Sequence, residues 1–222
     1  MKLVSMQIAL FSSELIARPD LLMNEVNDRL GKIFDAMPMI LNLPPDVPAE
    51  IPLAQIKSTD NIYALNIARN RTDFIISPNY QEDRLPHDAY KQYKAVIEKF
   101  YKAIVGSIAV KRVGVIFTLF EAAEDNVRPI YDKYLKENFP AGAAEAMIRT
   151  NQQTMNKGIV YNNIRNVQSA NLHVGKDLYK GVIIQLDTNN VPTDEVIPVD
   201  TVAAVVAYAS NKLKVGTVKE LI

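Results

Sequence analysis

The hydrophobic pattern of this chain switches between a two-residue period and a period of about 3.6 residues. Residues 2–11 alternate apolar and polar side chains, as a half-buried strand does. Residues 87–105 instead repeat apolar side chains at helical spacing and place lysines and a glutamate on the other face. Both kinds of element are therefore expected. The pattern predicts an α+β fold with antiparallel sheet packed against helices.

The predicted elements follow the order strand, helix, three strands, helix in each half of the chain. In the first half we expect strands at 2–11, 52–58, 61–69 and 72–78, and helices at 19–37 and 87–105. In the second half we expect strands at 110–120, 157–165, 167–175 and 178–187, and helices at 127–138, 142–155 and 198–213. The second half thus carries one additional helical segment. Residues 113–120 are apolar on both sides, which is typical of a central strand.

Some residues recur at slowly growing offsets between the halves. Lys2 lines up with Lys111 at an offset of 109 residues (111 − 2), and Arg18 with Arg128 at an offset of 110 (128 − 18). The matching element order and these residues predict two pseudo-repeated βαβββα units. The alternative is a single α+β sheet whose pattern repeats by accident.

If the repeat is real, the units are residues 1–108 and 109–222, either as two units or as one continuous domain. Two similar halves would pack about a pseudo-two-fold axis, with their first strands adjacent at the centre. The crevice between the halves would then be a natural ligand or partner site. The remaining edge strands could pair in a homodimer.

Composition excludes several classes of function. The chain has 25 basic and 25 acidic residues, and this balance disfavours nucleic-acid binding, which depends on neutralising phosphates. Because there is no Cys, neither disulfides nor thiolate chemistry can occur. The N-terminus lacks a signal-peptide pattern and no apolar run is long enough to span a membrane, so we expect a cytoplasmic protein.

Four side chains are candidates for ligand binding. Arg69 and Arg71 could contact an anion, or they could simply be solvated at a hairpin tip. Arg112 begins the strand that is predicted to be most buried, so it could pair with a carboxylate, reach the crevice, or be a strand-end charge in water. His173 lies near a strand end, and neither it nor His87 has a second histidine at metal-binding spacing.

Other polar patterns favour structural roles. His87 is expected as an exposed first-turn residue, although a general base is the alternative. The polar run at 187–190 could bind a cation but resembles a turn more closely. Tyr90, Tyr93 and Tyr101 have helical spacing and favour core packing over base stacking. No Gly-rich phosphate loop or G-x-S-x-G elbow occurs, so we predict no catalytic residue, metal or cofactor.

The segment Lys-Arg-Val-Gly-Val-Ile-Phe at 111–117 resembles the Arg-x-Gly strand of an uncharacterised prokaryotic family described only as sporadically distributed. The meander near Ile62-Tyr63-Ala64-Leu65 and the late Leu186-Asp187-Thr188 segment are also similar, so the resemblance covers nearly the whole chain. Phe117-Thr118 stands where the family has Tyr and Asn, and a second Asp is missing. The resemblance implies a mobile-element or defence context and no particular site.

These observations favour a non-enzymatic binding or protein-interaction protein that works as a homodimer or with another protein. The alternative is a small-molecule-binding protein or enzyme with a cavity resembling the helix-grip fold. A large closed pocket lined by Arg112, His173 or tyrosines would favour the alternative. A flat crevice and a large self-interface would favour the interaction protein.

Overall fold

The computed structural model describes residues 1–44, 46–80, 84–135 and 142–214. Its centre is a nine-stranded antiparallel sheet in the order β2-β3-β4-β5-β1-β6-β9-β8-β7. The strands are β1 (Lys2–Ser12), β2 (Met39–Ile40), β3 (Ala54–Lys57), β4 (Tyr63–Ile67), β5 (Arg71–Ile76), β6 (Val110–Ala122), β7 (Met147–Asn156), β8 (Ile159–Val174) and β9 (Asp177–Asn190). The predicted α+β class is confirmed.

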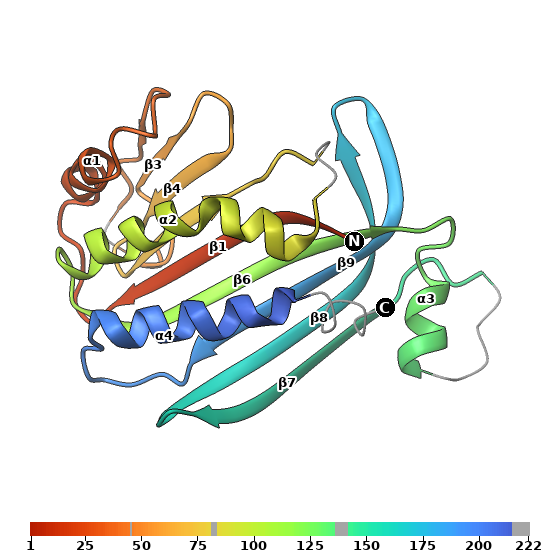
Figure 1. Ribbon diagram of the computed structural model, residues 1–222. Coiled ribbons are helices and arrows are strands. Elements are labelled where there is room, and N and C mark those ends of the chain that lie inside the picture. Colours follow the sequence, from red (N-terminus) through yellow and green to blue (C-terminus); the bar gives the residue numbers. More distant parts are fainter. Residues whose placement is uncertain (45, 81–83, 136–141, 215–222) are drawn as a thin grey trace.

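The helices lie mainly on one face of this sheet. They are α1 (Pro19–Arg29), α2 (Pro86–Val105), α3 (Arg128–Ile130) and α4 (Val199–Ser210), with a π turn at Tyr131–Leu135 and a 3-10 turn at Asn211–Leu213. Figure 1 shows α2 and α4 side by side across the sheet, while α3 stands apart at one end of the strands. No helix in the described ranges is both long and apolar enough to cross a membrane.

Helix α2 closes the core, as its amphipathic pattern predicts. Pro86 begins the helix, where the missing N–H costs no hydrogen bond. Tyr90, Tyr93 and Tyr101 are each buried, so their predicted role in core packing is confirmed. Phe100 is fully buried and its ring packs 4.7 Å from that of Phe74 on β5. These contacts attach α2 to the middle of the sheet.

The two first strands of the predicted units, β1 and β6, pair antiparallel at the centre of the sheet. On the helix side, Leu10 faces Val113 and Ile8 faces Val115, and all four side chains are buried. The opposite side of the same two strands carries Phe11 and the half-buried Arg112. Burial on the helix side therefore accounts for most of the apolar pattern of residues 113–120.

The predicted helix at 142–155 is wrong, because residues 147–156 form strand β7. A two-residue turn at Lys157 and Gly158, with φ of 50° and 77°, folds β7 back onto β8. Positive φ at both turn residues is typical of a tight hairpin with a type I′ turn. Pairing along the whole length of β8 outweighs the weak helical spacing of Ala143, Met147 and Ile148.

Three other boundaries differ from the prediction. The helix expected over 19–37 ends at Arg29, and Gly31 follows with a left-handed φ of 78°. The two strands expected at 157–165 and 167–175 are a single long strand, because β8 pairs with β9 without a break from Tyr161 onward. The polar run at 187–190 belongs to β9 rather than to a loop. The helix predicted at 127–138 is described only to Leu135.

Coverage of the sheet differs between its two ends. Helix α1 packs against β3 and β4, so that end of the sheet is covered on the helix side. At the other end, α3 contacts β8 but stands beside the sheet, and most of β7 is exposed. In the described part of the chain, the helix-side surface of β7 and β8 next to α4 is therefore largely uncovered. This asymmetry leaves a hollow beside the end of α4.

Candidate functional site

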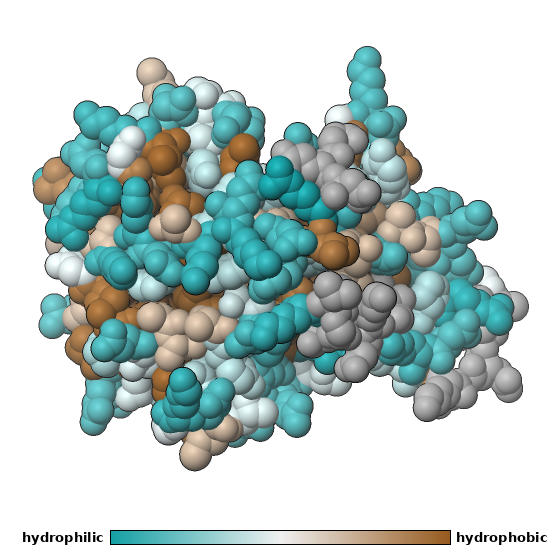
Figure 2. Space-filling model, viewed as in Figure 1, coloured by the Kyte–Doolittle hydropathy of each residue, from teal (hydrophilic) through white to brown (hydrophobic). Residues whose placement is uncertain are grey.

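A groove of about 360 Å³ lies between the end of α4 and the helix-side surface of β7 and β8. Its polar lining comes from Thr150, Gln152 and Thr154 on β7, Asn163 and Arg165 on β8, Tyr208 near the end of α4, and Lys212 in the 3-10 turn that follows α4. Figure 2 shows this side of the molecule as mainly hydrophilic, with hydrophobic residues gathered around α1 and along the seam between α2 and α4. Ile164 and Leu186 also line the groove, so its surface is mixed, with polar groups beside apolar ones.

Lys212 is held at the floor of the groove by neutral oxygen atoms. Its Nζ donates to Oγ1 of Thr188, at 2.6 Å, and to Oδ1 of Asn163. The ammonium also lies 5.5 Å from the centre of the Tyr208 ring. Thr188 is completely buried, so the amine reaches into the edge of the core. The side chain is therefore fixed in position without a carboxylate.

The electrostatic environment of Lys212 disfavours its positive charge. Burial of the amine and the like charge of Arg165 lower the pKa of Lys212 to about 8, although Asp187 acts in the opposite direction. Among the described residues, neither Lys212 nor Arg165 forms an ion pair. In the described part of the chain, two cations thus share one groove without an ion-pair partner, and Asp187 only partly balances the charge of Lys212.

A hydrogen-bonded network fixes the other polar groups of the groove. The hydroxyls of Thr154 and Tyr208 lie 2.9 Å apart, and Nδ2 of Asn163 donates to Oγ1 of Thr154 at 2.8 Å. The Tyr208 ring stacks on that of the buried Tyr161, with ring centres 4.2 Å apart. Because these contacts link α4 to β7 and β8, the wall is preorganised. Such a site can bind an anion with little rearrangement.

The predicted residues Arg71 and Arg112 come together, but on the opposite face of the sheet. Their guanidinium carbons each lie 5.1 Å from the centre of the Phe11 ring, on neighbouring strands. Arg71 pairs with Asp73 at 2.8 Å, and Arg112 donates to Oδ1 of Asn189 at 3.1 Å. Both cations therefore already have protein partners. Arg112 pairs with an amide and an aromatic ring here, rather than with a carboxylate.

Arg69 and His173 lie elsewhere. Nη2 of Arg69 donates to the carbonyl of Val47, which ties the loop before β3 to the end of β4. His173 is exposed near the tip of the β8–β9 hairpin, opposite Leu178. Neither residue joins the two arginines around Phe11. The four predicted residues therefore do not form one site.

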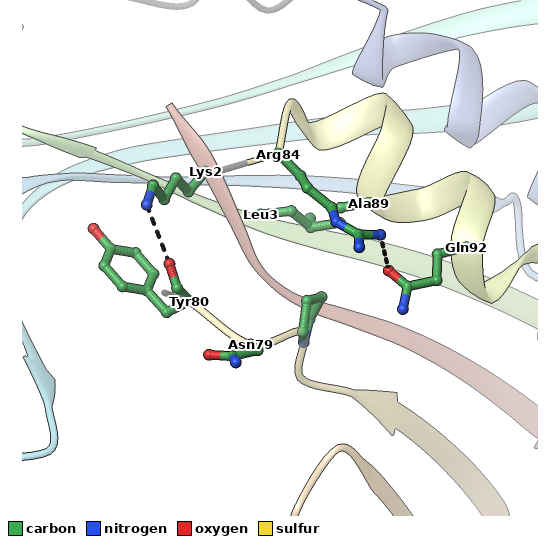
Figure 3. A pocket seen from close by; sticks show the side chains of 8 residues that line it. Lys2, Leu3, Asn79, Tyr80, Arg84, Ala89 and Gln92 are labelled. Carbon is green, nitrogen blue, oxygen red and sulfur yellow. Dashed lines mark hydrogen bonds between the residues drawn. The ribbon is translucent and has the colours of Figure 1, made fainter. Parts of the chain in front are cut away.

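A second hollow near the N-terminus is too small for an organic ligand. Figure 3 shows Lys2 above Tyr80, where its Nζ donates to the Tyr80 carbonyl at 3.2 Å, and Arg84 reaching Gln92. The volume of about 10 Å³ is only enough for one water molecule. In the part of the chain that the structure describes, no three His, Asp or Glu side chains cluster closely enough to hold a metal ion.

Sequence reasoning missed Lys212 and Arg165. Lys212 falls at the end of the apolar helix pattern at 198–213, where a lysine reads as a favourable charge near a helix C-terminus. Arg165 falls in a strand with many polar residues and has no distinctive neighbour. A lysine beside Leu213, at the buried end of an apolar helix, is a weak signal that could have directed attention to this position.

A comparison with models of protein families and with curated proteins finds no match.

Proposed function

We propose that this chain is a non-enzymatic binding protein whose groove between α4 and β7–β8 holds acidic side chains of a protein partner. The supporting observation is that Lys212 and Arg165 both line the groove while neither has an ion-pair partner among the described residues. A protein that keeps a desolvated cation without a carboxylate pays for it in stability. A carboxylate of a bound partner would pair with the cation and remove that cost, so partner binding would explain why the chain has such a site.

The shape of the groove supports a protein partner over a small molecule. Small-molecule sites are usually concave, mostly apolar and largely enclosed. This groove is open along β7 rather than enclosed, and threonine and amide side chains line it together with Ile164 and Leu186. These groups can donate to and accept from a polypeptide backbone, while the two cations select for acidic side chains.

Calorimetric titration with a hexaglutamate peptide tests this function. Replacing Lys212 or Arg165 with Gln should weaken binding roughly ten- to a hundredfold each, since one charged hydrogen bond is worth about 1.5–3 kcal/mol. Lys176→Gln, at an exposed hairpin tip, is the matched control and should leave affinity unchanged. Equal affinity of all the variants would contradict the proposal. Inorganic phosphate that binds as tightly as the peptide would show a small-anion site instead.

The alternative function, a small-molecule enzyme with a helix-grip-like cavity, has one observation in its favour. An amine with a pKa of about 8 is partly neutral at physiological pH and can attack a carbonyl group. Borohydride reduction in the presence of an oxo acid such as pyruvate should then attach the acid covalently to Lys212. Mass spectrometry that finds no adduct would leave the binding function as the better interpretation.

We further propose that the chain arose by duplication of a βαβββα unit, with halves 1–108 and 109–222. The strand order supports this, because β4 and β5 lead to β1 on one side as β8 and β9 lead to β6 on the other. Profiles built separately from the two halves of a set of relatives provide the test. They should align strand by strand, and an alignment out of order would refute duplication.

We propose a cytoplasmic protein that self-associates, that does not bind nucleic acid, and that belongs to the sporadically distributed family with its mobile-element or defence context. The balanced charge supports the exclusion of nucleic acid. Genes encoding a nuclease, a toxin or phage proteins beside this one would support the family context, and housekeeping neighbours would count against it.

A further inference from the structure

The two edges of the sheet are protected very differently. The β2 edge is only two residues long, and Pro38, Pro44 and Pro48 lie beside it in the chain. The β7 edge is ten residues long, contains no Pro and a single charged residue, Arg149, and is exposed at eight of its positions. Proteins normally guard edge strands with short length, proline or charge, because an open edge pairs with other strands. Strand β7 is therefore suited to pair with a strand of another molecule.

The hairpin turn identifies which backbone groups of β7 face outward. In a two-residue type I′ hairpin, the residues that flank the turn exchange both hydrogen bonds. Asn156 faces Ile159 across the Lys157-Gly158 turn, so the even-numbered residues of β7 bond to β8. The N–H and C=O groups of the odd-numbered residues point away from β8. These residues are Met147, Arg149, Asn151, Gln153 and Met155.

We propose that β7 pairs antiparallel with β7 of a second copy of this chain, with Asn151 of both copies on the two-fold axis. This register is the one that places Met147 opposite the partner's Met155, and the reverse. These are the most exposed methionines of the strand, at 66% and 73%, and each would cover the other. All five outward-facing residues would be opposite outward-facing residues, which completes the backbone ladder.

Charge and chemistry favour this register and a second copy as the occupant. Arg149 would lie opposite the partner's Gln153, whereas centring the pair on Arg149 would bring two arginines together. Threonine and amide side chains at 150–154 are self-complementary, because each can donate and accept. The chain has no net charge to oppose approach of a copy. A two-fold pair also closes after one step and leaves no open β7 edge.

The dimer has a consequence for the groove. Thr150, Gln152 and Thr154 point to the helix side and form its outer wall. In the dimer this wall would continue into that of the second copy, so two cationic grooves would flank the axis on one face. The inference rests on the proposed self-association, and it adds the strand, the register and the shared wall.

Single cysteine substitutions can determine the register directly, because the natural chain contains no Cys that could form a competing disulfide. Asn151→Cys should form an intermolecular disulfide under mild oxidation, since opposite residues in a ladder have Cα atoms about 5.5 Å apart. Arg149→Cys and Gln153→Cys are matched controls, because each would lie four residues out of register with its own copy, and both should stay largely uncoupled. Preferential coupling at 149 or 153 would overturn the register while leaving self-association intact.

Sedimentation equilibrium tests whether the pairing occurs at all. The unmodified chain should be a dimer, and Asn151→Pro should weaken association at least tenfold because it removes a central outward N–H. Asn151→Ala keeps that N–H and should remain dimeric. The melting temperature of the proline variant checks that the monomer still folds, since this N–H does not bond to β8. A monomeric natural chain would overturn both the inference and the proposed self-association, whereas a dimer insensitive to the proline would overturn only the β7 surface.

Discussion

The stability of this protein should depend on pH through Lys212, in a direction opposite to that of most lysines. The folded-state pKa of about 8 lies below the usual value of 10.5, so the unfolded chain binds more protons between these two values. Stability therefore rises as pH increases from 8 towards 10.5. Below pH 8 both states are protonated and the cost of the buried charge is fully present.

The magnitude follows from the size of the pKa shift. A difference of 2.5 pKa units (10.5 − 8) corresponds to about 3.5 kcal/mol at about 1.4 kcal/mol per unit, as an upper bound. Between pH 7 and pH 9.5 about 2 kcal/mol of this should be regained. Because Lys212 remains partly exposed, solvent screening reduces the expected gain to about 1–2 kcal/mol.

Urea denaturation at pH 7 and at pH 9.5 measures this effect when the natural chain is compared with Lys212→Met. Methionine has a similar length and no charge, so other titrating groups cancel in the difference between the two proteins. The free energy of unfolding of the natural chain should gain about 1–2 kcal/mol over the variant between the two pH values. Parallel pH dependence, or a relative loss at pH 9.5, would refute the assignment of a desolvated amine.

Two further substitutions test the framework that positions the groove. Phe117→Ala, in the central strand β6 where the side chain is 1% exposed, should reduce the free energy of unfolding by about 3–5 kcal/mol in urea denaturation, and a loss below 1 kcal/mol would show that the centre repacks freely. Asn190→Ala should cost about 1–3 kcal/mol, because Oδ1 of Asn190 accepts from the buried Val113 N–H at 2.7 Å. Faster hydrogen exchange at that N–H would accompany the loss, and unchanged exchange would exclude this hydrogen bond as its cause.

Local pattern predicted the elements well wherever burial is one-sided and continuous. Helix α2 and strands β1 and β6 fall within two residues of their expected bounds. The reason is that the spacing of apolar side chains within each element is enough to predict it. The β7–β8 hairpin was predicted poorly. Residues 147–156 are exposed on both faces. Their side chains therefore do not alternate between apolar and polar, which is the pattern that would have predicted a strand. Pairing with β8, rather than burial, makes this segment a strand.

The candidate site was the least predictable part. Arg71 and Arg112 were selected as charges in strands, and the structure brings them together around Phe11 with partners already in place. The groove depends instead on Lys212, which hydrogen-bonds to residues 49 and 24 positions away in the chain. Because these partners lie so far apart in the chain, no short stretch of the sequence could have predicted the hydrogen bonds of Lys212.

The amino-acid sequence by itself determined the α+β class, the burial of the tyrosine stripe on α2 and the balanced charge. Each of these follows from composition or from side-chain period within one element. Only the tertiary structure decided that α1 covers one end of the sheet while β7 and β8 stay largely open in the described part of the chain, and that two cations meet there without an ion-pair partner among the described residues. The physical reason is that desolvation and ion pairing depend on which distant segments pack together.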